Sequence, residues 1–215
     1  MPPISTNMAD KGYVTDDLVA HYSARAKGGV GLIVTEVVTV EPTYVYLPGD
    51  MSIYDDSFIP GWKKLVDGVH QYGTKILAQL FHPAYMAFPV PGTPQLIAPS
   101  CVGPYYAQSA PTIEELHTIV DQFGQAAHRV QIAGGDGVEI QCAHAHGLLG
   151  GFLTPLYNKR TDEYGGNIDG RLRLCLEVIA SVRKYCGDDF IIDVRISGDE
   201  YSEGGLTLND QIYVC

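Results

Sequence analysis

Positive charge is scarce in this sequence. Lysine and arginine together number 14, against 25 aspartates and glutamates, which leaves a formal net charge of -11. The acidic residues are spread along the chain and form no long run. Nucleic acids and anionic membrane surfaces bind proteins through clustered basic residues. The composition therefore argues against both as partners.

Long hydrophobic runs are missing as well. No stretch approaches the roughly 18 uninterrupted apolar residues that are typical of a membrane-spanning helix. Residues 1–12 have neither the basic start nor the apolar centre of an export signal. Cysteine is sparse as well. The five cysteines are odd in number and form no C-x-x-C pair. We expect free thiols in a reducing cytoplasm, and no metal site.

One pattern recurs four times along the chain: an amphipathic stretch ends near glycine, and a run rich in β-branched residues follows. Glycine tolerates the left-handed conformation that closes many helices. Nearly continuous apolar runs suit strands that are buried on both faces of a parallel sheet. The predicted strands are Gly31–Val37, Thr74–Leu80, Asp136–Gln141 and Phe190–Ile196.

The segments between these runs have helical periodicity. Apolar residues spaced three and four apart predict helices over about 16–27, 61–72 and 169–185, and another from 112 onward. Thr112 and Glu115 have the spacing of a capping box, in which each side chain satisfies a free amide of the first turn. Residues 208–215 resemble the start of a further helix.

Alternating strands and helices indicate a parallel sheet, either doubly wound or closed as a (β/α)8 barrel. The strands lack the G-x-G-x-x-G turn that is typical of the doubly wound nucleotide-binding fold. Polar residues also gather at or just past the carboxyl ends of the strands, which form the active-site face of a barrel. These residues are Glu36, Gln79, His82, Gln141, His144 and Arg195.

A closed barrel needs about 250 residues, and this chain has 215. The sequence shows four full strands, and Met1–Ser5 resembles the tail of an earlier one. We therefore expect an α/β fold consisting of one incomplete barrel domain over residues 1–215. It would run from the end of strand 1 to strand 5 and lack the last three β/α units.

The segment Asn158–Gly166 (NKRTDEYGG), followed by Arg171, resembles the N-x-R-T-D-E-Y-G-G signature of the old yellow enzyme family of NADH:flavin oxidoreductases. The spacing from Ile140 to Asn158 resembles that of the branch containing enoate reductase, 2,4-dienoyl-CoA reductase and bile-acid reductase. Parent proteins of that branch carry a 4Fe-4S cluster and FAD, which the resemblance places outside this chain. Further matching segments are Gly28–Glu36, Ala78–His82, Ala133–Ile140 and Val194–Ser197.

The resemblance implies FMN as cofactor and NAD(P)H as the donor. Gln79 matches a glutamine whose amide, a donor and an acceptor in one plane, binds the pyrimidine edge of the flavin. Arg195 matches an arginine that stabilises negative charge near flavin N1. Four more positions match residues beside the flavin ring: Pro3, Ile4, Ser5 and Val37. From the residues alone, Gln79 could instead cap a loop, and Arg195 could form a structural ion pair. The further positions beside the ring could belong to ordinary barrel packing.

The substrate-binding pair departs from the family pattern, which is His-x-x-Asn or His-x-x-His followed by a tyrosine. Gln141 replaces the first histidine and can donate a hydrogen bond but carries no charge. His144 matches the second position. Direct counting puts His146 in place of the tyrosine, as a catalytic acid or as a solvent-facing loop histidine. Alignment to the longer branch puts Gly147 there instead, which leaves no acid.

The implied function is ene-reduction, in which reduced FMN transfers hydride to the activated C=C bond of an unsaturated carbonyl compound. One alternative is a non-catalytic fragment that binds FMN weakly, because the family holds the FMN phosphate after strands 7 and 8. A remote alternative is a metal-dependent barrel hydrolase that uses His144 and His146. The expected partner is a small-molecule substrate, and a homo-oligomer is compatible with the sequence.

Overall fold

Parallel strands form the centre of the molecule. The computed structural model describes residues 1–88, 95–101 and 109–215. Within these ranges the strands form one sheet in the order β2-β1-β3-β4-β5, and every pairing is parallel. The strands are β1 (Leu32–Thr39), β2 (Met51–Ser52), β3 (Lys75–Phe81), β4 (Gly137–Gln141) and β5 (Ile191–Arg195).

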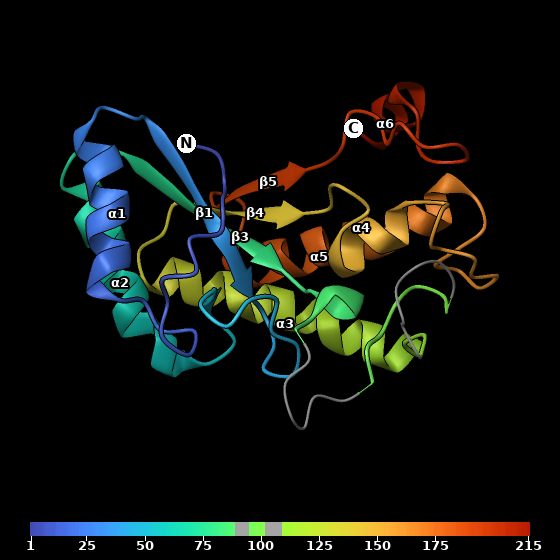
Figure 1. Ribbon diagram of the computed structural model, residues 1–215, viewed down its shortest axis with the longest axis horizontal. Coiled ribbons are helices and arrows are strands. Elements are labelled where there is room, and N and C mark those ends of the chain that lie inside the picture. The colour runs from blue at the N-terminus through green and yellow to red at the C-terminus, as the bar shows by residue number, and fades with distance from the viewer. Residues whose placement is uncertain (89–94, 102–108) are drawn as a thin grey trace.

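The four longer strands follow one another across the sheet in chain order, from β1 through β3 and β4 to β5. A doubly wound sheet would reverse its order at a switch point, whereas a barrel adds each strand on the same side. The two edge strands do not pair with each other in the described part of the chain, so the sheet stays open (Figure 1). The predicted partial barrel is therefore confirmed.

Six α-helices accompany the sheet in the described ranges, and those predicted from the sequence begin and end close to the expected residues. The Thr15 hydroxyl accepts the Leu18 amide at the start of the first helix, and the capping box of Thr112 and Glu115 is formed in the third. The helices are α1 (Asp16–Lys27), α2 (Ile59–His70), α3 (Ile113–Ile132), α4 (Gly147–Leu153), α5 (Ile168–Cys186) and α6 (Leu208–Val214).

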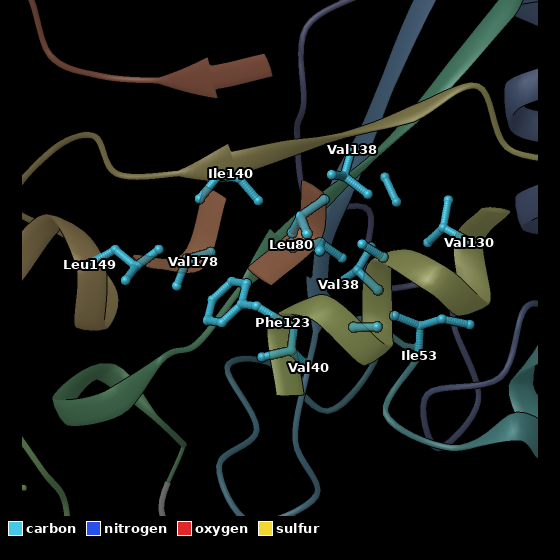
Figure 2. Close-up of a cluster of buried hydrophobic side chains, with 14 of the residues drawn as sticks. Val38, Val40, Ile53, Leu80, Phe123, Val130, Val138, Ile140, Leu149 and Val178 are labelled. Atoms are coloured by element: carbon cyan, nitrogen blue, oxygen red, sulfur yellow. The ribbon is translucent and has the colours of Figure 1, made fainter. Parts of the chain in front are cut away.

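One face of the sheet is apolar and packs against the helices. Side chains alternate between the two faces of a strand, so residues two apart share a face. Figure 2 shows strand residues from this face meeting side chains of the helices, and all of them are fully or almost fully buried. The cluster includes Val38, Leu80, Val138, Ile140, Phe123, Val130 and Val178. The opposite face carries polar residues, among them Gln79 and Glu139, which are paired in register.

Two elements were missed by the sequence patterns. The short strand β2 pairs with the end of β1, and helix α4 consists of the glycine-rich run GLLGGFL. The expected strand over Met1–Ser5 is not formed. However, the Met1 amino group donates to the Leu32 carbonyl (2.6 Å), and the Val34 amide donates to the Met1 carbonyl (3.0 Å). The first residue therefore lies along β1 as a neighbouring strand would.

Over the described ranges, none of the helices has the length and apolar character needed to cross a bilayer. All five cysteines are free thiols, as the sequence predicts.

Candidate functional site

A cavity of about 150 Å³ opens at the carboxyl ends of the strands and brings all the predicted site residues together. Its walls come from the N-terminal segment, β1, β3, the end of β4 with the loop that follows, and β5. A larger hollow of about 560 Å³ lies beside α3 and contains none of these residues. The cavity is lined by Pro3, Ile4, Ser5, Val37, Tyr46, Gln79, Phe81, Gln141, His144, His146 and Arg195.

A bulge in β1 shapes one wall of the cavity. The register against β3 shifts between Val34 and Val37, so Thr35 and Glu36 occupy the irregular stretch. Side chains satisfy its backbone, because the Glu36 amide donates to the Tyr22 hydroxyl (2.9 Å). The Glu36 carboxylate in turn accepts the amide of Thr6 (2.5 Å). This bond holds the N-terminal segment, and with it the predicted ring-contacting residues, against β1.

Burial dominates the electrostatics beneath this wall. The Glu36 side chain is fully buried, and burial raises its pKa, opposed by the hydrogen bonds from Thr6. Burial and the nearby Glu36 raise the pKa of Asp50 to about 7. Two neighbouring carboxyl groups that are both hard to ionise favour retention of a proton between them.

Gln79 is held in one orientation by a buried hydrogen bond. Its Nε2 donates to Oε1 of Glu139 on the neighbouring strand at 2.5 Å. The amide oxygen is thereby left to accept a hydrogen bond in the cavity. Burial, together with Asp193, raises the pKa of Glu139 to about 7, against the bond from Gln79 and the charge of Arg195, which lower it.

Arg195 ends β5 and points its charge at the cavity. Within residues 1–88, 95–101 and 109–215, no ion pair involves its guanidinium group. Its charge nevertheless acts on its neighbours. Burial lowers the pKa of His144, and the positive charge of Arg195 lowers it further. An unpaired cation here attracts negative charge that develops on a bound ligand.

The loop after β4 presents the predicted substrate-binding residues. The Gln141 side-chain oxygen accepts the Ala143 amide (3.1 Å), which leaves its NH₂ group as a donor. His144 and Ala145 have positive φ angles of 68° and 49°, a conformation that costs energy for residues with a Cβ. The His144 amide donates to the Ser197 hydroxyl (2.7 Å), and Tyr85 donates to the Ala145 carbonyl. These bonds stabilise the strained loop, and they give Tyr85 a contact that the sequence did not indicate.

The two alignments put either His146 or Gly147 in the place of the family's tyrosine, and the structure shows what each position can hold. Gly147 has φ 62°, and a Cβ there would lie 2.3 Å from the Phe81 ring and 2.7 Å from the His82 carbonyl oxygen. No side chain fits at Gly147. His146 does line the cavity, its Nε2 is buried without a partner among the described residues, and burial and His144 lower its pKa.

Two cavity residues, Tyr46 and Phe81, were missed from the sequence. Phe81 lies two residues after Gln79 on β3, so strand alternation alone puts both on one face. Tyr46 belongs to the loop between β1 and β2, and no local pattern indicates where its ring lies.

The most family-specific motif lies outside the cavity. The Asn158 side chain donates to the carbonyls of Phe152 and Tyr164, each at 2.7 Å. Arg171 donates to the carbonyls of Leu153 (3.0 Å) and Gly166 (2.7 Å). The signature therefore fastens the connection between α4 and α5 and has a structural function.

The cavity thus combines an oriented amide, an unpaired arginine and apolar side chains at the carboxyl ends of parallel strands, which is where barrel enzymes have their active sites. The sequence profile of the NADH:flavin oxidoreductase / NADH oxidase family matches residues 1–215. The chain belongs to this family.

Individual relatives agree. The chain is 38% identical over 216 residues to an NADH oxidase of Thermoanaerobacter brockii, covering 98% of this chain and 33% of that protein. A solved 2-naphthoyl-CoA reductase superposes with a TM-score of 0.91 at 26% identity, covering 99% of this chain and 35% of that one. Morphinone reductase gives 0.87 at 27%, with 99% and 61% covered. The chain thus spans between about a third and three fifths of the length of the curated relatives that it matches.

Proposed function

We propose that this chain forms the flavin-ring half of an FMN-dependent oxidoreductase that reduces activated C=C bonds, with NAD(P)H as the donor. The observation that supports this most directly is the convergence of every predicted ring- and substrate-contacting residue on one cavity. A solved complex of morphinone reductase with tetrahydroNAD supports a nicotinamide donor. Residues 1–215 would then be one incomplete FMN-binding barrel domain.

The residues present fit a flavin ring. Gln79, fixed by Glu139, would bind the pyrimidine edge, and the unpaired Arg195 would lie near flavin N1. When bound, FMN supplies hydride transfer, which no side chain can perform. The walls that would contact the ring are formed by Pro3, Ile4, Ser5 and Val37.

On the substrate side, Gln141 and His144 would both bind a carbonyl oxygen. The Gln141 NH₂ group is left as a donor by its bond to Ala143. Burial and Arg195 lower the pKa of His144, so its neutral form is favoured at neutral pH. Two neutral donors polarise a carbonyl but do not charge it, which suits an unsaturated ketone or ester better than a carboxylate. His146 would contact the same substrate.

Some alternatives keep their place beside this proposal. The cavity is compatible with a chain that does not catalyse the reaction by itself. It is also compatible with a parent protein that is cytoplasmic, forms a homo-oligomer, or carries a 4Fe-4S cluster and FAD. The hydrolase alternative has less support, because within the described residues no three His, Cys, Asp or Glu side chains converge on one point.

The test uses the protein encoded by the complete reading frame. We expect a flavin absorption spectrum and NAD(P)H oxidation that depends on an unsaturated carbonyl compound. Arg195→Gln should lower the rate by about 10²–10³-fold, the usual effect of removing one electrostatic stabiliser. The control is Arg183→Gln, because Arg183 only bonds carbonyls at the end of α5. Purified protein with bound zinc and no flavin would contradict the proposal.

A further inference from the structure

Three aromatic rings meet in the cavity. Ring centroids of Tyr46 and Phe81 are 5.4 Å apart, those of Tyr46 and His146 are also 5.4 Å apart, and those of Phe81 and His146 are 5.5 Å apart. All three pairs are edge-to-face, a geometry that stabilises aromatic clusters. The cluster places a phenol beside His146, the histidine that direct counting puts in place of the family's tyrosine.

The loop that carries Tyr46 is fixed to the cavity wall. The Leu47 amide donates to the Asp50 carboxylate (3.1 Å), and the Gly49 amide donates to the Asn7 side chain (2.8 Å). The Ala9 amide donates to the Gly49 carbonyl (2.8 Å). Tyr46 is therefore held next to the N-terminal segment that would contact the flavin ring.

Tyr46 and His146 differ in their ability to give up a proton at neutral pH. Burial and His144 lower the pKa of His146, so the imidazolium form is disfavoured, and a neutral imidazole is a very weak acid. Burial and then Asp50 raise the pKa of Tyr46, so its hydroxyl keeps a proton to donate. Among the described residues no group hydrogen-bonds to this hydroxyl, which leaves it available to a substrate.

We propose, on the basis of the proposed function, that Tyr46 is the proton donor of this site and takes over the role of the tyrosine that is missing after His144. Reduction of the double bond needs two electrons and two hydrogens. Reduced FMN, when bound, would supply both electrons and one hydrogen as hydride to the β-carbon, so the second hydrogen has to come from the protein as a proton at the α-carbon. The Tyr46 O–H bond breaks as a C–H bond forms at the α-carbon, and water reprotonates the phenolate.

The kinetic test separates hydride transfer from protonation. In Tyr46→Phe, reduction of the flavin by NAD(P)H should be unchanged, while turnover of an unsaturated ketone should fall by about 10²–10⁴-fold, the usual range for a general acid. A nitroalkene yields a nitronate, which is stable in water without protonation. Tyr46→Phe should therefore still consume a nitroalkene and release the nitronate.

Tyr44→Phe is the matched control. Tyr44 lies two residues away, and its hydroxyl donates to the Gln95 carbonyl (3.1 Å) outside the cavity. It should keep the turnover of the parent protein with both substrates. Full ketone turnover by Tyr46→Phe, together with its loss in His146→Phe, would overturn the proposal in favour of His146.

An NMR titration of Tyr46 in the absence of substrate completes the test. With tyrosine labelled at 13Cζ, the resonance absent from Tyr46→Phe should titrate above the ordinary tyrosine pKa of about 10. Titration at or below that value would contradict a protonated donor. A parent protein that carries no flavin at all would instead defeat the proposed function, and the role of Tyr46 with it.

Discussion

Glu139 is a carboxyl group whose ionisation the fold opposes. It is 5% exposed, it accepts a hydrogen bond from Gln79, and it pairs in register with Asp193 on β5. Burial and Asp193 raise its pKa to about 7, from 4.5 in an unfolded chain. Its proton is therefore linked to the stability of the fold and to the orientation of the Gln79 amide.

The Glu139→Gln variant should be more stable than the parent chain, and only above mildly acidic pH. As the pH rises from about 4.5 to 7, the unfolded state loses the Glu139 proton while the folded state keeps it. The parent chain therefore loses stability over this window, by on the order of 3 kcal/mol at about 1.36 kcal/mol per pKa unit. Glutamine imitates the protonated acid and avoids this loss. Urea unfolding of both proteins at pH 4 and pH 8 measures the difference.

Glu203→Gln is the control, because Glu203 is exposed in the loop after β5. It should leave the pH dependence of unfolding unchanged. Equal stabilities of the parent and Glu139→Gln at both pH values would show that Glu139 ionises as freely in the fold as in the unfolded chain.

Single residues differ in how far the sequence could place them. Gln79 and Arg195 lie on strands, where alternation and the strand end fix the side chain's direction, and both line the cavity as predicted. The function of each is still a prediction. Tyr46 could not be placed, because its position depends on bonds from its loop to Asn7 and Asp50, residues far along the chain or outside any periodic element.

At the scale of elements, capping explains which helices were predictable. α1 and α3 begin at threonines whose side chains accept backbone amides, and both start where the sequence indicates. α4 has three glycines in seven residues, and glycine costs about 1 kcal/mol per helical position relative to alanine. All its residues are buried, so packing against the rest of the fold stabilises it, and packing is not visible in local sequence.

Gly147, the first residue of α4, is constrained both by its positive φ angle and by close neighbours. Comparison with Gly29 separates the two effects. Gly147→Ala would introduce strain at φ 62° and also a clash with Phe81 at 2.3 Å. Gly29→Ala meets only the strain, since φ is 92° and no atom lies within 4 Å of its Cβ position. We expect a loss of about 1–2 kcal/mol for Gly29→Ala and about 1–3 kcal/mol more for Gly147→Ala.

Denaturant unfolding of the two variants provides the comparison. Because the clash would displace Phe81, one of the three rings of the aromatic cluster, Gly147→Ala should also disturb the cavity, and Gly29→Ala should not. Equal losses of stability would mean that the fold relaxes around Gly147 without cost.

At the scale of the whole molecule, hydrophobic patterning determined most of the architecture. Continuous apolar strands separated by amphipathic helices allow few topologies, and the four longer strands follow the chain order that is expected for a barrel. The helix-facing side of the sheet follows from alternation alone (Figure 2). The polar side could not be resolved in the same way, because networks such as Gln79 with Glu139 depend on register between strands.

The thiols report on whether this architecture forms as a whole. Cys101 and Cys215 are exposed, while Cys142, Cys175 and Cys186 are buried. The sulfurs of Cys142 and Cys175 lie 2.9 Å apart, and this contact, with burial, raises the pKa of Cys142 well above its ordinary value. Burial raises the pKa of Cys186 to about 11. Burial shields all three of these thiols from reagents, and since the thiolate is the reactive form, the raised pKa values of Cys142 and Cys186 lower their reactivity further.

A disulfide reagent such as DTNB at pH 8 should therefore modify two of the five thiols quickly in the folded chain, and all five in denaturant. The two fast sites should be lost one at a time in Cys101→Ser and Cys215→Ser. Cys142 follows β4 and contacts Cys175 on α5, so its reactivity reports on the packing between β4 and α5, the seam between strand and helix. Rapid reaction of Cys142 in native buffer would show that this seam is open in solution and that the cavity does not keep the geometry described above.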